Sequence, residues 1–94
     1  MKKYEAMYII RPELDEEQRK TVMEEVSATF TNHGSVVSEV KEWGLRDLAY
    51  EIAKCTKGYY VLLNVEATVE AVNEFNRVCN IKEAVIRHIL VKDE

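Results

Sequence analysis

Apolar and polar residues alternate most regularly in the middle of the chain, where two such runs flank a short connection. Alternation with a period of two predicts β-strands, and two strands joined by a short loop predict a β-hairpin. Lys54–Gly58 forms the connection, and pairing Ala53 with Gly58 closes it. Leu48 then lies opposite Leu63. The apolar positions of the two arms are Leu48, Tyr50 and Ile52, followed by Tyr59, Val61, Leu63 and Val65. One face of the hairpin is therefore apolar and needs other elements to cover it.

The flanking sequence predicts two helices and further strands. Asp15 and Gln18 have the spacing of a capping box at the start of a first helix, which Gly34 ends. Thr68 is a suitable N-cap for a second helix, with Asn80 as its terminator. Strands are expected over Lys3–Arg11, from Val36 into the hairpin with a bulge before Trp43, and over Ala84–Lys92.

The resulting order of elements is β-α-β-β-α-β, and we expect a single domain over residues 1–94. This order is typical of the ferredoxin-like, or split βαβ, arrangement. It is an α+β fold in which a four-stranded antiparallel sheet carries both helices on one face. Right-handed crossovers place the first and third strands in the centre of that sheet.

Two helices on one face leave the other face of the sheet open, and the sequence predicts that this open face is apolar. The alternation points these residues outward: Met7, Ile9, Tyr60, Leu62, Val85, Ile89 and Val91. Arg87 shares their parity, and the strand ends carry Lys2, Lys3, Arg11 and Lys92. An apolar patch of this extent is a homodimer face or a docking surface for another chain, and the pattern leaves both alternatives open.

Charge and candidate chemistry exclude several function classes. The net charge of −4 argues against broad nucleic-acid binding, so any RNA contact must be small and local. Cys55 and Cys79 lack CxxC spacing, and His33 and His88 are far apart, so no metal or other cofactor is expected. Cys55 is expected in the hairpin loop, with no activating neighbour for either thiol.

No phosphate loop, nucleophile elbow or HExxH motif is present, and no enzyme is predicted. The sequence has no apolar run of membrane-spanning length and no signal-peptide pattern, which predicts a cytoplasmic protein.

Four segments resemble the bacterial ribosomal protein S6 family of the small subunit. They are MKKYEAMYIIRPELDEE, EWGLRDLAYEIAK, GYYVLLNVEA and EAVIRHILVK, and together they span almost the whole chain. The resemblance implies the same ferredoxin-like fold and a non-catalytic role at the ribosome. That role is to bind the central domain of small-subunit ribosomal RNA together with the basic ribosomal protein S18. It further implies a partner-binding surface of Met7, Ile9, Tyr60 and Leu62, and RNA contacts by Lys2, Arg46, Arg87 and Lys92.

The chain departs from the family pattern in the hairpin. The family commonly has a second basic residue after the position of Arg46 and a proline after Tyr50, where this chain has Asp47 and Glu51. Asp47 weakens the expected RNA contact of the hairpin, and Glu51 restores a backbone N–H that can extend strand pairing. The alternative interpretation is a ligand-sensing regulatory domain that dimerises through the same open face. A small enzyme that uses this face as an active-site floor is a third possibility, which nothing in the sequence requires.

Overall fold

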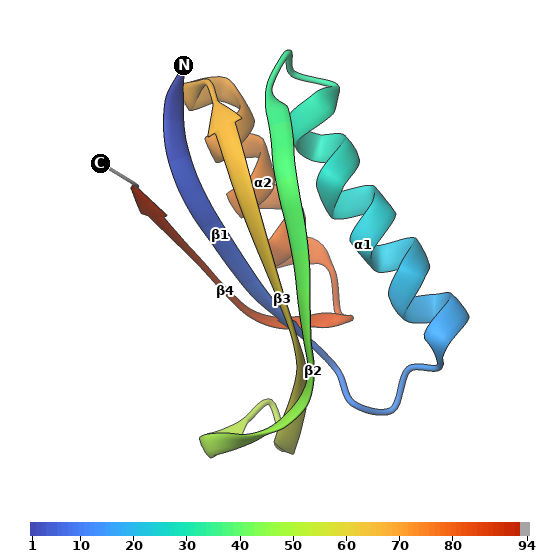
Figure 1. The fold of residues 1–94 in the computed structure, drawn as a ribbon. Helices are drawn as coiled ribbons and strands as arrows, with labels where there is room; N and C mark the ends of the chain where they lie inside the picture. The colour runs from blue at the N-terminus through green and yellow to red at the C-terminus, as the bar shows by residue number, and fades with distance from the viewer. Residues whose placement is uncertain (93–94) are drawn as a thin grey trace.

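A computed structural model describes residues 1–92 and has the expected order of elements (Figure 1). The four strands form one sheet in the order β2-β3-β1-β4, and every neighbouring pair is antiparallel. The elements are β1 (Lys2–Ile10), α1 (Glu16–Thr31), β2 (Val36–Ile52), β3 (Cys55–Ala67), α2 (Val69–Ile81) and β4 (Val85–Lys92). The ferredoxin-like fold is confirmed, with β1 and β3 in the centre of the sheet as predicted.

Both helices begin where the sequence predicts. The Gln18 backbone N–H donates to the Asp15 carboxylate at 2.8 Å, and the Asp15 N–H donates to the Gln18 side chain at 3.1 Å, so the capping box is complete. The Ala71 N–H donates to the Thr68 hydroxyl at 3.2 Å at the start of α2. These contacts satisfy backbone donors that the first helical turn leaves free.

The core lies between the two helices and one face of the sheet. Phe30 of α1 stacks on Phe75 of α2 with ring centroids 5.2 Å apart. Alternate residues of β1, including Tyr8 and Ile10, are fully buried beneath them, as the alternation predicts. Burial of each large apolar side chain contributes about 1.5–3 kcal/mol, so this layer accounts for most of the stabilisation that positions the sheet.

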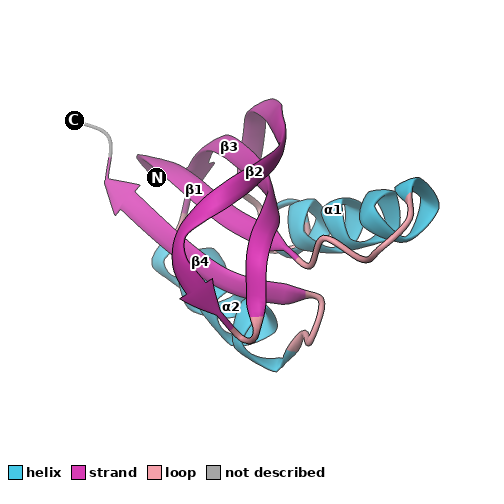
Figure 2. Cartoon of the chain, turned by 90° about the horizontal axis from the view of Figure 1, so that it is seen from below, coloured by secondary structure: helices cyan, strands magenta, loops and turns pink. Residues whose placement is uncertain are grey.

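The predicted register of the hairpin is wrong. Ile52 pairs with Cys55 around a two-residue turn, and Val40 rather than Leu48 lies opposite Leu63. The turn residues Ala53 and Lys54 have φ angles of 49° and 66°, the left-handed conformation that a two-residue hairpin turn requires. The sequence gives no Gly or Asn signal for this turn. The extra residues are accommodated by three irregularities in the pairing of β2 with β3, and the far end of the hairpin bends toward the side of β4 (Figure 2).

Val85 was expected on the open face, and this prediction is also wrong. Ile9 pairs with Arg87, but Ile10 pairs with Val85, so Ile86 is an extra residue in the ladder between β1 and β4. An extra residue in a strand moves every residue on its N-terminal side to the opposite face of the sheet. Val85 is consequently buried in the core.

Candidate partner and RNA-binding surface

The four predicted partner-binding residues lie together on the sheet face opposite the helices. Met7 pairs directly with Leu62, and Ile9 pairs with Tyr60. On the other side of β1, Ile89 pairs with Met7. Directly paired residues project to the same face, so an apolar row crosses β3, β1 and β4. Ile89 is 40% exposed and Val91 is 53% exposed, as the predicted open face requires.

The face is less open than the sequence predicts, because the end of the hairpin lies over part of it. Ile9 has the parity of the open face, yet only 3% of its surface is exposed. The end of β2 and the sheet line a half-open hollow of about 140 Å³. Its lining comprises Met7, Ile9, Tyr60, Arg87 and Ile89 from the sheet, and Leu48, Ala49, Tyr50 and Ile52 from the hairpin. Sequence reasoning missed this cover, because it placed the alternation of Leu48, Tyr50 and Ile52 over the core.

Two arginines predicted to contact RNA are engaged with aromatic rings of the chain itself. The Arg87 guanidinium donates to the Tyr50 hydroxyl, and its Cζ lies 5.8 Å from the centre of the Tyr50 ring. Arg46 lies over the Trp43 ring at 5.5 Å and donates from Nε to the Trp43 carbonyl oxygen at 3.3 Å. A guanidinium has five N–H donors, so each arginine keeps donors for a phosphate while its ring contact fixes its position.

The other two predicted RNA contacts meet at the opposite end of the sheet. Lys92 pairs near the start of β1, where Lys2 is located. Contact with the Lys2 ammonium lowers the pKa of Lys92, through a direct side-chain interaction and through charge repulsion. Two adjacent exposed ammonium groups are a favourable site for an anion. Arg87 pairs with Ile9, seven residues along β1 from Lys2. At about 3.3 Å per residue this separation is about 23 Å, so the structure divides the four basic residues into two sites.

An arginine that the sequence analysis placed only on the rim contacts a cysteine at the hairpin end. Arg11 Nη1 lies 3.6 Å from Cys55 Sγ, and Arg11 Nε donates to the Glu83 carbonyl oxygen at 2.7 Å. Cys55 is the first residue of β3 and is buried, so its expected place in the hairpin loop is wrong. Arg11 is a charged neighbour of this thiol that the sequence did not indicate.

His88 and Cys79, the remaining candidate groups, have packing roles in the fold. His88 packs edge-on against Phe75, with centroids 5.6 Å apart, and burial lowers its pKa, as expected for an interior histidine. Burial also raises the pKa of the Cys79 thiol to about 12, which keeps it protonated and unreactive. Within residues 1–92, no group of three His, Cys, Asp or Glu side chains is arranged to hold a metal ion. No helix in that range is long and apolar enough to cross a membrane.

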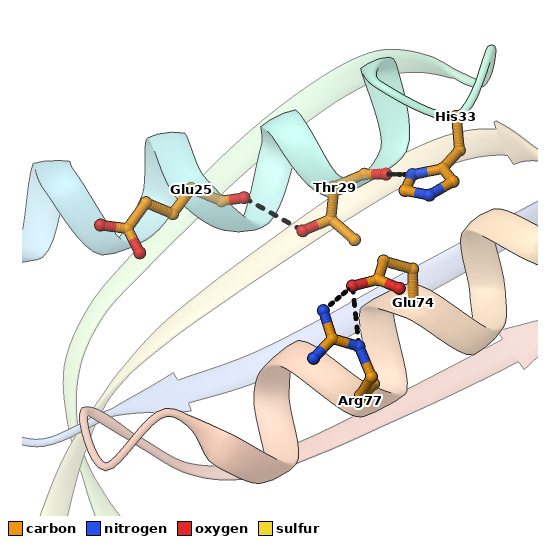
Figure 3. A network of polar contacts seen from close by, with 5 residues as sticks. All are labelled: Glu25, Thr29, His33, Glu74 and Arg77. Atoms are coloured by element: carbon orange, nitrogen blue, oxygen red, sulfur yellow. Dashed lines mark hydrogen bonds and ion pairs between the residues drawn. The ribbon is translucent and has the colours of Figure 1, made fainter.

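The polar groups on the helix side form short local contacts. The Thr29 hydroxyl donates to the Glu25 carbonyl oxygen at 3.1 Å, and His33 Nδ1 lies 2.9 Å from the Thr29 carbonyl oxygen (Figure 3). Arg77 and Glu74 form an ion pair on α2 (Figure 3). A larger groove of about 790 Å³ separates α1 from β2, where Arg19 covers the Tyr59 ring at 4.4 Å. The glutamates of α1 are exposed, as predicted.

Comparison with known proteins identifies the family. A family model described as ribosomal protein S6 matches residues 3–92. The chain belongs to the ribosomal protein S6 family. Among solved structures, 30S ribosomal protein S6 from Thermotoga maritima matches with a TM-score of 0.92 and 26% sequence identity, covering 98% of this chain and 87% of that one. The S6 family has a structural, non-enzymatic role in the small ribosomal subunit, which agrees with the resemblance found in the sequence.

Proposed function

We propose that this chain is a structural constituent of the small ribosomal subunit that binds the central domain of its RNA cooperatively with the basic ribosomal protein S18. In this proposal it acts in cytoplasmic ribosomes and catalyses no reaction. The observation that carries the proposal is the apolar row of Met7, Leu62 and Ile89 across three strands, with basic residues at both ends of the same sheet.

The charge of the chain supports a shared RNA interface. With a net charge of −4, the chain cannot neutralise many phosphates by itself. Lys2 and Lys92 at one end, and Arg46 and Arg87 at the other, supply only local contacts. A basic companion seated on the apolar row would add the remaining positive charge and would bury the exposed side chains of Ile89 and Val91.

The proposal is tested by measuring RNA binding with and without S18. We expect weak binding of the chain alone and a clear gain in affinity when both proteins are present, because the two binding events are coupled. Equal affinity in the two conditions would contradict cooperativity. A tight, concentration-independent homodimer of the isolated chain in light scattering would instead favour the regulatory-domain alternative.

Leu62→Asp tests the docking face itself. A carboxylate at the β3 end of the apolar row, directly beside Met7, would be buried without a partner in the complex, so S18 binding should weaken by at least about 2 kcal/mol in calorimetry. Val69→Asp is the matched control, because Val69 is exposed at the first turn of α2, on the helix side of the sheet. Unchanged S18 affinity of Leu62→Asp, with the variant folded, would remove this face from the proposal.

A further inference from the structure

The end of the β2–β3 hairpin, residues 47–55, covers the same sheet face that the proposed function assigns to the companion. We propose that this segment is a displaceable strap, which closes the docking face in the free chain and swings away when the companion binds. The identity of the companion in this inference, S18, rests on the proposed function. The strap itself is inferred from the structure of the free chain alone.

Ile9 shows that the strap hides part of the docking surface. Its pairing with Tyr60 and Arg87 places it on the open face, beside the apolar row and two residues from Met7 along β1. Its exposure of only 3% results from packing beneath the hairpin, with Leu48 among the residues that surround it. A companion that covers Ile9 as well as the apolar row must therefore replace the strap.

The strap is weakly joined to the rest of the sheet. The regular pairing of β2 with β3 passes from Asp47 opposite Lys57 directly to Ile52 opposite Cys55. The four residues 48–51 have no partner in this ladder. The strap can lift without disrupting the pairing that begins at Arg46 and Gly58. Segments with few cross-strand hydrogen bonds open locally at a lower free energy than the core of a sheet.

Two arginines contact the strap, one at its middle and one at its end. Arg87 of β4 donates to the Tyr50 hydroxyl, and Arg11, just after β1, lies 3.6 Å from Cys55 Sγ. Tyr50 nevertheless remains 60% exposed, so its ring contributes little buried area to closure. The Arg87 contact involves exposed side chains, and a thiol is a weak hydrogen-bond acceptor, so each of the two contacts is weak. The strap is therefore fixed in position without being strongly bound.

The strap covers the sheet only in part. The hollow of about 140 Å³ between the hairpin and the sheet is open to solvent on one side, and Leu48 and Ile52 are only half-buried. Closure of the strap therefore buries only part of its apolar surface. Apolar side chains of a companion can cover Ile9 and Met7 in place of Leu48 and Ile52, which compensates for the burial lost on opening.

The two cysteines provide a direct test of opening that needs no companion. Cys55 is 8% exposed and lies within the strap, whereas Cys79 is a residue of α2 that is buried in the core. In native buffer, a thiol reagent such as Ellman's reagent should modify Cys55 through local opening and Cys79 only through global unfolding. Leu48→Ser removes much of the apolar burial under the strap, so it should raise the rate of Cys55 modification by about tenfold. The ratio of the rate of Cys79 modification to the rate of global unfolding should stay unchanged.

Two results of this thiol experiment would overturn the strap. Modification of Cys55 no faster than that of Cys79 would mean that the hairpin opens only when the chain unfolds. A rate at Cys55 that Leu48→Ser does not change would mean that the thiol reacts without opening. Val69→Ser on the helix side is the matched control and should not change the reaction of Cys55.

Calorimetry with S18 tests the role of the strap. If only open molecules bind S18, the apparent affinity equals the intrinsic affinity multiplied by the fraction of open molecules. Leu48→Ser raises that fraction, so it should tighten S18 binding by up to about tenfold. Weaker S18 binding by Leu48→Ser would mean that the hairpin end is part of the interface. It would overturn the inference that the strap and S18 compete for the same face. If neither the wild type nor the variant binds S18, the proposed function fails, while the thiol kinetics still decide whether the strap opens.

Discussion

The Cγ2 methyl of Ile9 occupies the space into which a side chain at position 58 would project. A Cβ atom on Gly58 would overlap with this methyl and would lie 3.4 Å from Leu48 Cδ2 and 3.6 Å from Ile86 Cδ1. The glycine therefore lets side chains from β1, β2 and β4 meet over β3. This contact forms a small second cluster on the face opposite the main core, and it is where the hairpin end meets the sheet.

Gly58→Ala should destabilise the protein by about 1–3 kcal/mol, the usual cost of forcing an extra carbon into a packed site. Urea unfolding monitored by circular dichroism measures the change. Ile9→Ala removes the methyl that causes the overlap, so the double variant should lose less stability than the sum of the two single variants. Strict additivity of the two losses would show that Ile9 and Gly58 do not share this contact.

Much of the fold follows from local signals that the structure confirms. The alternation through Tyr8 and Ile10 placed β1 correctly against the helices, and the caps at Asp15 and Thr68 located both helix starts. These signals depend on neighbouring residues and on a constant period, so they can be read from one sequence.

The errors lie where extra residues change the register of a strand. The extra residue Ile86 returned Val85 to the core, and a two-residue turn without glycine shifted the hairpin register. Nothing in the local sequence distinguishes a bulge from regular alternation, because the choice depends on packing against other strands. The cover over Ile9 was missed for the same reason.

Tyr8→Phe should stabilise the protein by about 1 kcal/mol. The Tyr8 hydroxyl is buried without a hydrogen-bond partner among the described residues, so its removal eliminates a desolvation cost. Thermal unfolding at neutral pH measures this gain. Tyr4→Phe is the control, because Tyr4 lies on the same strand face but is only half-buried, and it should change stability little.

The same variant has a predicted pH dependence. Burial raises the pKa of Tyr8 above its ordinary value near 10, with smaller contributions from Cys79 and Glu42. The folded state therefore holds the phenol proton that the unfolded state releases, so this contribution to stability is complete below about pH 10 and is lost as the pH rises further. Wild type should lose more stability than Tyr8→Phe between pH 9 and 11, the range in which an unfolded-state tyrosine goes from about one-tenth to about nine-tenths ionised. Parallel losses would contradict a buried, protonated Tyr8.

His88→Leu should reduce the loss of stability in acid. Burial lowers the pKa of His88, so the folded state favours the neutral ring that packs edge-on against Phe75. Its contribution is present above the unfolded pKa of about 6.5 and is lost as the pH falls through the lower folded value. Comparing urea unfolding at about pH 7.5 and pH 5 should show a smaller difference for the variant than for the wild type. An identical difference would mean that His88 is already accessible to protonation in the folded state.

Lys92→Gln tests whether the two ammonium groups at the end of the sheet bind a phosphate. The Lys2 ammonium lowers the pKa of Lys92, so the pair is under mutual repulsion that a bound phosphate would relieve. Loss of one phosphate contact should weaken RNA binding at low salt and reduce the slope of log affinity against log salt by about 1. Lys20→Gln is the control, because it removes the same charge from α1 on the helix side of the sheet. Only charges that contact phosphates release counterions, so this variant should keep the slope within about 0.3 of the wild-type value. Equal slopes for wild type and Lys92→Gln would assign the RNA contact to the arginines at the hairpin end instead.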